Sequence, residues 1–108
     1  MITAEFTKNS LGSLTGFRFY GHADYAEEGY DIICSAVSAL SLNTVNSITE
    51  LLHEKAEAEV QEDGFLACCV QDPENPYVQL LLKSLELGIR SVEQSYGSKY
   101  ITVHYSVR

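Results

Sequence analysis

The stretch DIICSAVSALSLNTVNSITEL, residues 31–51, decides the fold of this chain. Residues suited to a protein core recur in it every three or four positions, at Ile33, Val37, Leu40, Thr44, Ile48 and Leu51. This spacing is typical of one face of an amphipathic helix, and it predicts a helix over roughly 31–53. Asp31 is a residue type that favours the N-cap, and Cys34 would then be the third helical residue.

The segments on either side of this helix alternate between apolar and polar residues, as half-buried strands do. Residues 2–7 (ITAEFT) and 14–20 (LTGFRFY) predict a hairpin joined by a turn at 11–13. Residues 56–61 and 65–70 predict a second hairpin, because the Asp-Gly pair between them is a strong turn signal.

A second amphipathic pattern covers residues 78–96 and predicts another helix. Asn75 is a suitable N-cap, Pro76 suits the first helical position, and Gly97 suits the position just past the end. The final segment, 100–107, alternates again as a strand. The order is therefore ββαββαβ. So few elements must share one core, which predicts an α+β fold with a mixed sheet and two helices packed on it.

Length and charge narrow the function classes. The chain has 108 residues, so we expect one domain over 1–108, and 45% hydrophobic residues exclude a disordered chain. The net charge of −8 disfavours nucleic acid and anionic lipid as main partners and favours a basic partner. Neither a secretory signal nor an apolar run of roughly 18 residues is apparent, so we expect a cytoplasmic protein with no membrane partner.

The cysteine pattern indicates a reducing compartment. There are three cysteines, Cys34, Cys68 and Cys69, and an odd number with two adjacent is no disulfide framework. Cys68 and Cys69 lie in a predicted strand, so one is expected in the core and the other on the opposite face. The histidines are scattered and no C-x-x-C motif occurs, so we expect no metal site.

Two residues could carry chemistry together. His22 follows a strand, and Cys34 lies at a helix start, where the helix dipole favours a thiolate. A histidine beside it could accept the thiol proton, which is the minimum for a cysteine nucleophile with its base. The alternative is a core cysteine and a histidine that only holds a turn. Cys34, Ser38 and Ser41 form a small, polar helix stripe that could line a site, or form a close helix–helix or subunit contact.

The motifs GHA at 21–23 and GYDIICSAVS at 29–38 resemble the paired motifs of the ribosomal-processing cysteine proteases, the Prp family. The resemblance extends over the whole chain. It implies a cytoplasmic homodimer without a cofactor, which removes a short N-terminal extension from a large-subunit ribosomal protein. It also implies that His22 is the general base and Cys34 the nucleophile, with Asp31 and Ser38 in supporting positions. Family substrates are cut after a pair of aromatic residues and before a small one.

The loop between the two motifs is a candidate substrate loop. Tyr25 and Tyr30 are its large side chains, and Gly29 could act as a hinge, so we expect the loop to cover the residues before the cut. The acidic residues here and around the second hairpin are expected to be solvated. Those beside the site would also attract a basic substrate.

Two other functions are compatible with the residues alone. A small acidic protein could be a non-enzymatic binding module or assembly factor for a basic ribosomal protein. A redox-sensing thiol protein is less well supported, because no resolving cysteine lies close to Cys34 in the sequence.

Overall fold

The computed structural model describes residues 1–21, 30–60 and 66–108, with the backbone alone at 30 and 31. The elements, in chain order, are β1 (Ile2–Lys8), β2 (Leu14–Tyr20), α1 (Tyr30–Asn46), the π-helical turn η1 (Ser47–Leu51), β3 (Ala56–Val60), β4 (Leu66–Val70), α2 (Pro76–Tyr96) and β5 (Ile101–Val107). The predicted ββαββαβ order and α+β class are confirmed.

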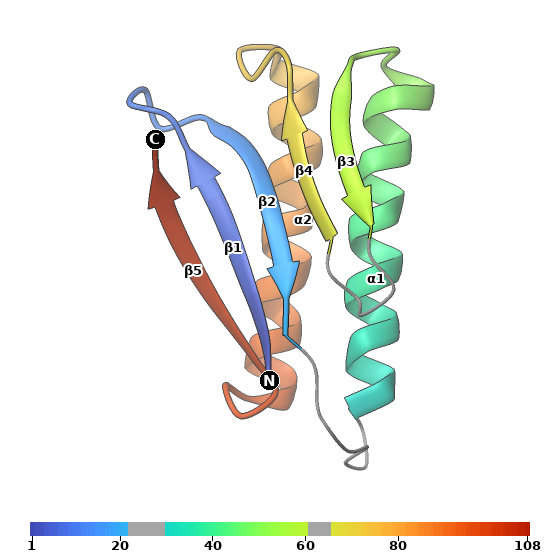
Figure 1. Ribbon diagram of the computed structural model, residues 1–108, viewed down its shortest axis with the longest axis vertical. Helices are drawn as coiled ribbons and strands as arrows, with labels where there is room; N and C mark the ends of the chain where they lie inside the picture. The colour runs from blue at the N-terminus through green and yellow to red at the C-terminus, as the bar shows by residue number, and fades with distance from the viewer. Residues whose placement is uncertain (22–29, 61–65) are drawn as a thin grey trace.

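The strands form one mixed sheet of five strands in the order β3-β4-β2-β1-β5 (Figure 1). The pairs β1–β2, β2–β4 and β3–β4 are antiparallel, whereas β1 and β5 are parallel. Each helix connection therefore carries the chain to an edge of the sheet, because β3 follows α1 and β5 follows α2. The two edge strands are β3 and β5.

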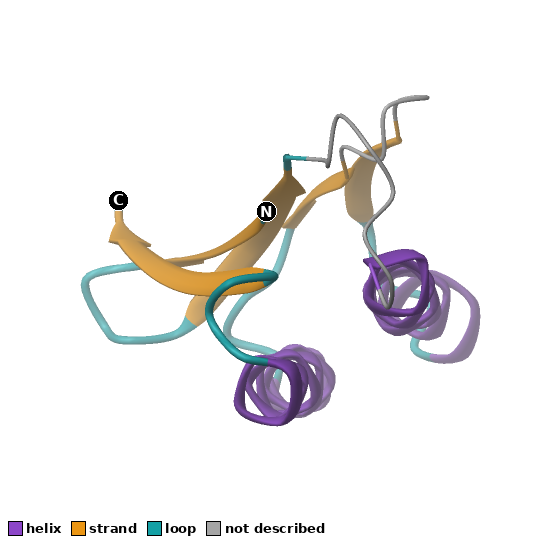
Figure 2. Cartoon of the chain, turned by 90° about the horizontal axis from the view of Figure 1, so that it is seen from below, coloured by secondary structure: helices purple, strands orange, loops and turns teal. Residues whose placement is uncertain are grey.

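Both helices cover the same face of the sheet (Figure 2). They lie side by side, with α1 below β3 and β4 and α2 below the other strands (Figures 1 and 2). The opposite face of the sheet has no helix over it among the described residues. The core consequently fills the space between the sheet and the two helices.

Strand alternation supplies the core with aromatic residues. Phe6, Phe17 and Phe19 are at most 2% exposed, and Phe6 pairs with Phe17 across β1 and β2. The rings of Phe17 and Phe19 are stacked at 5.2 Å, and the Phe6 and Phe19 rings meet edge to face at 5.9 Å. Such geometries add roughly 0.5–1.5 kcal/mol per pair beyond burial alone.

The first helix differs from its predicted limits. It begins at Tyr30 rather than at Asp31, and it ends in the π-helical turn, in which the Leu52 N–H donates to the Ser47 carbonyl at 3.2 Å. His53, predicted as the last helical residue, has a positive φ of 54° and lies beyond the helix end. The hydrophobic spacing predicts Leu51 on the core face, but the wider π-helical turn changes the side-chain positions, and Leu51 is 74% exposed.

One property of this helix contradicts the expectation that no segment could span a membrane. By length and composition alone, Ile32–Leu51 is long and apolar enough to do so. However, Ile33 and Ile48 are fully buried beneath the sheet, and Val37 is 5% exposed. The segment therefore packs as the core helix of a globular protein.

The second helix has the predicted ends. The side chain of Asn75 accepts hydrogen bonds from the N–H groups of Tyr77 at 2.9 Å and Val78 at 3.4 Å, and Pro76 is the first helical residue. Gly97 ends the helix with a φ of 96°, a conformation that a glycine adopts without strain.

Candidate active site

Cys34 is the fifth residue of α1, near its N-terminus. The side chain is partly exposed and also packs against the hydrophobic core. Because α1 starts at Tyr30, Asp31 is its second residue and not the N-cap, and Cys34 lies further inside than predicted. The dipole effect is concentrated in the first turn, so it favours a Cys34 thiolate less strongly than it would at the third position.

The side of α1 that carries Cys34 follows from its packing against α2. A Cβ atom built on Gly88 of α2 would lie 3.3 Å from Cδ1 of Leu40, so Leu40 marks the flank of α1 that faces α2. Cys34 precedes Leu40 by six residues, which places it about 120° around the helix axis. Ile33 and Val37 fill the core between them. Cys34 therefore lies on the flank of α1 that faces away from α2.

The polar stripe on this flank is divided between surface and core. Ser38 is exposed, one turn beyond Cys34. Ser41 is 1% exposed, and its hydroxyl donates to the Val37 carbonyl at 2.7 Å. Of the three stripe residues, Ser41 is therefore a satisfied core residue rather than part of a site lining. Cys34 and Ser38 remain accessible.

The other predicted site residues are not placed by the structure. His22, Tyr25 and Gly29 lie outside the described residues. Tyr30 and Asp31 belong to the first turn of α1, but their side chains also lie outside what is described. The proximity of His22 to Cys34 therefore stays a prediction.

The residue immediately before His22 is constrained by its surroundings. Gly21 has a φ of 97°, and a Cβ atom there would clash with the carbonyl oxygen of Met1. A glycine is thus required both for the backbone conformation and for the close approach to the first strand. This explains the first residue of the GHA motif in physical terms, since it fixes where the chain leaves β2.

We expect Gly21→Ala to destabilise the fold more than Gly97→Ala and to lower proteolytic activity. Both glycines have nearly the same positive φ, 97° and 96°, but nothing lies within 4 Å of a Cβ at Gly97. Gly97→Ala should cost about 1–3 kcal/mol for the backbone conformation alone, because its φ of 96° and ψ of 159° fall in a region adopted almost only by glycine. Urea unfolding and peptide cleavage measure the two effects. Equal destabilisation of the two variants, with unchanged cleavage, would contradict this role of Gly21.

The paired cysteines of β4 lie on opposite faces, as predicted. Cys68 is 5% exposed within the core, whereas Cys69 is exposed on the open face of the sheet. Burial, and to a smaller extent the adjacent Cys69, raises the pKa of Cys68 from 9.0 to about 11. At neutral pH only about one Cys68 thiol in ten thousand is ionised, so it is a poor nucleophile.

We expect iodoacetamide to modify Cys34 fastest and Cys68 slowest at neutral pH. The thiolate is the reactive species, and the high pKa of Cys68 withholds it until the pH approaches about 11. Peptide mapping by mass spectrometry after brief treatment gives the three rates. Preferential modification of Cys69 would argue against an activated Cys34.

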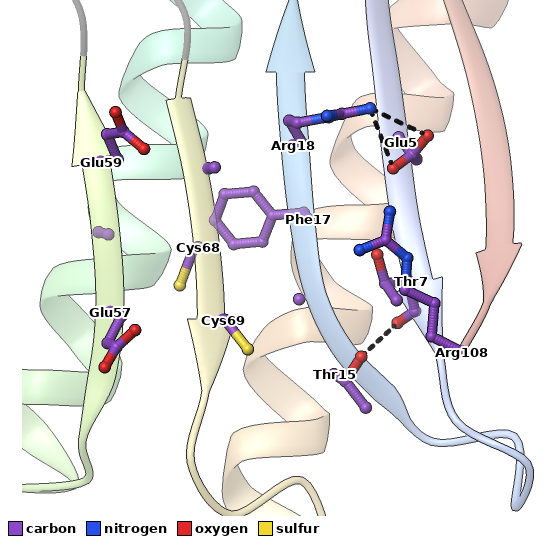
Figure 3. A pocket seen from close by; sticks show the side chains of 13 residues that line it. Glu5, Thr7, Thr15, Phe17, Arg18, Glu57, Glu59, Cys68, Cys69 and Arg108 are labelled. Atoms are coloured by element: carbon purple, nitrogen blue, oxygen red, sulfur yellow. Dashed lines mark hydrogen bonds and ion pairs between the residues drawn. The ribbon is translucent and has the colours of Figure 1, made fainter.

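The open face of the sheet holds a groove that the sequence analysis did not identify (Figure 3). Its volume is about 580 Å³, and the row Glu5–Arg18–Ala67–Glu59 crosses its floor through paired strand positions. Arg18 forms an ion pair with Glu5 at 3.5 Å. Cys34 is not among the lining residues, because α1 packs on the other face. The alternation of small and charged residues along these strands is the sequence pattern that could have indicated this groove.

Comparison with known proteins identifies the family. The model of the family described as cysteine protease Prp matches residues 1–102. The ribosomal processing cysteine protease Prp of Staphylococcus aureus (strain Mu50) is 34% identical over 99 residues, which cover 90% of this chain and 92% of that protein. Its namesake in Bacillus subtilis (strain 168) is 29% identical over 101 residues, covering 89% and 90%.

The chain belongs to the cysteine protease Prp family. It is a cysteine protease of the ribosomal-processing type. This membership favours the protease over the binding-module and redox alternatives.

Solved structures of this family share the fold closely. The S. aureus Prp in complex with a substrate peptide superposes with a TM-score of 0.90 at 30% identity, covering 98% of this chain and all of that one. The same protease with a covalently linked product peptide gives a TM-score of 0.87 at 31% identity, with the same coverage. The two-helix, five-strand arrangement is therefore that of a Prp protease.

Proposed function

We propose that this protease removes a short N-terminal extension from a large-subunit ribosomal protein, with Cys34 as nucleophile and His22 as general base. The observation that carries the proposal is a partly exposed Cys34 near the start of α1, within a chain that matches the Prp family over residues 1–102. A relative that forms a covalent link with its product peptide supports covalent catalysis by a cysteine.

The chemistry proceeds through an acyl-enzyme. His22 accepts the proton of the Cys34 thiol, and the thiolate attacks the carbonyl carbon of the scissile peptide bond. His22 then donates this proton to the leaving amine, and a thioester to Cys34 remains. Water attacks the thioester with His22 as base, which releases the extension as a carboxylic acid and restores the thiol. No cofactor takes part in these steps.

Backbone groups at the start of α1 can assist the first attack. The N–H groups of the first helical residues have no acceptor within the helix, and the positive end of the dipole lies there. Tyr30 begins this turn, one turn before Cys34. We assign the stabilisation of the tetrahedral oxyanion to these backbone groups. Asp31 and Ser38 support the site from neighbouring positions.

The test uses the precursor of the ribosomal protein that carries such an extension. Purified protease is mixed with it, and intact-mass spectrometry follows both products. We expect one cut, after a pair of aromatic residues and before a small residue. A precursor that binds but stays intact would overturn the proposal and favour the binding-module alternative.

The remaining expectations are a cytoplasmic location and a homodimer. The outer face of α2 supports the dimer, because Leu80 and Leu87 are 64% and 69% exposed on it. Tyr77, Ser84 and Ser91 continue their stripe at spacings of three and four. Leu80 and Leu87 lie four residues before and three residues after Ser84, so a two-fold axis near Ser84 brings Leu80 of each copy beside Leu87 of the other. Light scattering measures the mass of the wild type and of Leu87→Glu. We expect a dimer for the wild type and a monomer for the variant, and a wild type that is already monomeric would exclude the dimer.

A further inference from the structure

The free edge of β3 has the backbone geometry to accept another strand. The N–H of Gln71 donates to the Lys55 carbonyl at 3.1 Å, in phase with the antiparallel pairs Glu57–Cys69 and Glu59–Ala67. Antiparallel ladders alternate, so these positions direct their backbone groups toward β4. The backbone N–H and C=O groups of the intervening residues, Ala56, Ala58 and Val60, therefore point away from the sheet.

The side chains of β3 leave this edge open. Ala58 is exposed and small, and Val60 is 63% exposed. The strand contains no proline, lysine or bulge over Ala56–Val60, and such features commonly protect sheet edges. The strand does carry Glu57 and Glu59, both exposed, on the open face of the sheet (Figure 3).

The carboxylates of Glu57 and Glu59 determine which kind of strand can pair with the free edge of β3. If β3 paired antiparallel with a second copy about Ala58, Glu57 of each copy would lie opposite Glu59 of the other on one face. Like charges directly opposite each other destabilise a strand pair, whereas opposite charges stabilise it. The edge therefore disfavours a second copy. It fits an extended peptide with lysine or arginine at alternate positions.

The same side of the molecule carries Cys34. The sheet ends at β3 above α1, and Cys34 lies on the flank of α1 that faces away from α2, toward this outer side (Figures 1 and 2). A short connection joins the end of α1 and η1 to Ala56, so β3 runs back toward the start of α1. The Val60 end of the edge is thus the end nearer to Cys34.

Element lengths give the approximate spacing between the edge and the nucleophile. The helical segment from Cys34 to Leu51 is about 25 Å long. The strand β3 runs back alongside it for about 14 Å. The remaining distance along the helix axis is roughly 10 Å, and the sheet and helix layers are separated by about 10 Å, so the gap is about 14 Å, or about four extended residues. Substrate residues that follow the cut would run antiparallel to β3 along the path from Cys34 toward Val60, whereas residues that precede the cut would run parallel to it. Antiparallel pairing is the more stable of the two, so we assign the edge to the residues that follow the cut.

We propose that β3 binds the basic segment on the C-terminal side of the cut as an additional antiparallel strand. This proposal rests on the proposed function and names the part of the substrate that is recognised. Backbone groups of Ala58 and Val60 hold the segment. Glu57 and Glu59 select lysine or arginine side chains on the open face. The segment begins about four residues after the cut.

The test compares two peptides that share the same cleavage site. The short peptide ends about three residues after the cut, and the long peptide continues for about six more with lysine at alternate positions. The readout is the ratio of kcat/KM for the long peptide to that for the short one. We expect a ratio of about tenfold for the wild type, falling as salt is raised, since exposed charges are screened.

Ala58→Pro removes an outward N–H without removing a donor to β4. We expect it to lower the long-to-short ratio about fivefold, which corresponds to one lost hydrogen bond. Val107→Pro is the matched control on the other edge strand, where Val103, four residues earlier in the same phase, donates its N–H to Glu93 rather than to β1. It should leave the ratio unchanged. Circular dichroism confirms that both variants fold.

Charge is tested separately. The double variant Glu57→Gln and Glu59→Gln should lower the ratio about two- to fivefold and flatten its salt dependence. Glu50→Gln, in the exposed part of η1, is the matched control and should do neither. A double variant that retains the full ratio and salt dependence would overturn the role of the carboxylates.

The outcomes distinguish this proposal from the proposed function. Equal cleavage of both peptides by the wild type overturns strand addition and leaves the protease proposal intact. If neither peptide is cut, the proposed function fails. In that case, fluorescence anisotropy of the long peptide tests strand addition without cleavage. Weaker binding to Ala58→Pro than to Val107→Pro supports binding at the β3 edge, and equal binding to both variants overturns it. A change of oligomeric mass in Ala58→Pro alone would assign the edge to a second copy.

Discussion

Replacing Cys34 with alanine should abolish cleavage while the fold remains intact. The side chain is partly exposed near the start of α1, and alanine is a good helix residue that fills most of the same space. Losing the nucleophile removes the acyl-enzyme route altogether, so kcat/KM should fall by at least about two to four orders of magnitude. Cleavage of the precursor is followed by mass spectrometry, and thermal unfolding verifies the fold.

Cys69→Ala is the matched control for this prediction. Cys69 is an exposed thiol on the open face of the sheet, outside the face that carries α1. This variant should cut at the wild-type rate. If Cys34→Ala cuts normally, or if Cys69→Ala is the inactive variant, the assignment of the nucleophile is wrong.

Replacing His22 with alanine should lower activity nearly as much. Without the imidazole, the thiol keeps its proton and the leaving amine has no proton donor, so both halves of the first step suffer. We expect a loss of about two to four orders of magnitude in kcat/KM. The rate that remains should rise with pH as hydroxide replaces the base. This pH dependence separates a lost base from a merely disturbed loop.

His104→Ala is the control for the histidine. His104 is exposed in β5, at a position paired with Glu5 of β1. Its replacement should change neither kcat/KM nor the pH profile. A His22→Ala variant that folds normally and retains most of its activity would remove His22 from the catalytic pair.

Much of the fold could be predicted because local signals agree with the tertiary structure. Asn75 and Pro76 define the start of α2, and Gly97 defines its end. Adjacent Cys68 and Cys69 were expected on opposite faces, because side chains alternate along a strand, and they lie so. Each of these features depends on a few neighbouring residues, which is why the sequence alone reveals it.

The remaining features depend on contacts between distant segments. The strand order β3-β4-β2-β1-β5 and the parallel β1–β5 pair are properties of the assembled sheet. Leu51 fits the α-helical spacing of the sequence, but the wider π-helical turn leaves it 74% exposed. Ser41 resembled a site residue because its type is polar. Its hydroxyl is satisfied by the Val37 carbonyl inside the helix, which the sequence does not reveal.

The catalytic assignment came from two kinds of inference. A cysteine near a helix start is a physical signal for a reactive thiol, and the structure places Cys34 there. The histidine partner was inferred from the resemblance of the GHA motif, since a loop of this length permits many positions for His22. Gly21, next to it, has a clear structural requirement, although sequence reasoning treated it only as part of a motif and a loop.

Covalent capture of the nucleophile tests the central claim most directly. A peptide that ends in the aromatic pair and carries a chloromethyl ketone at its C-terminus resembles the residues before the cut and alkylates a thiolate within reach. The modified protein is digested and mapped by tandem mass spectrometry. We predict one label per chain, on Cys34, which forms far more slowly in His22→Ala. A label on Cys69, or continued cleavage by protein whose Cys34 is fully labelled, would contradict the account.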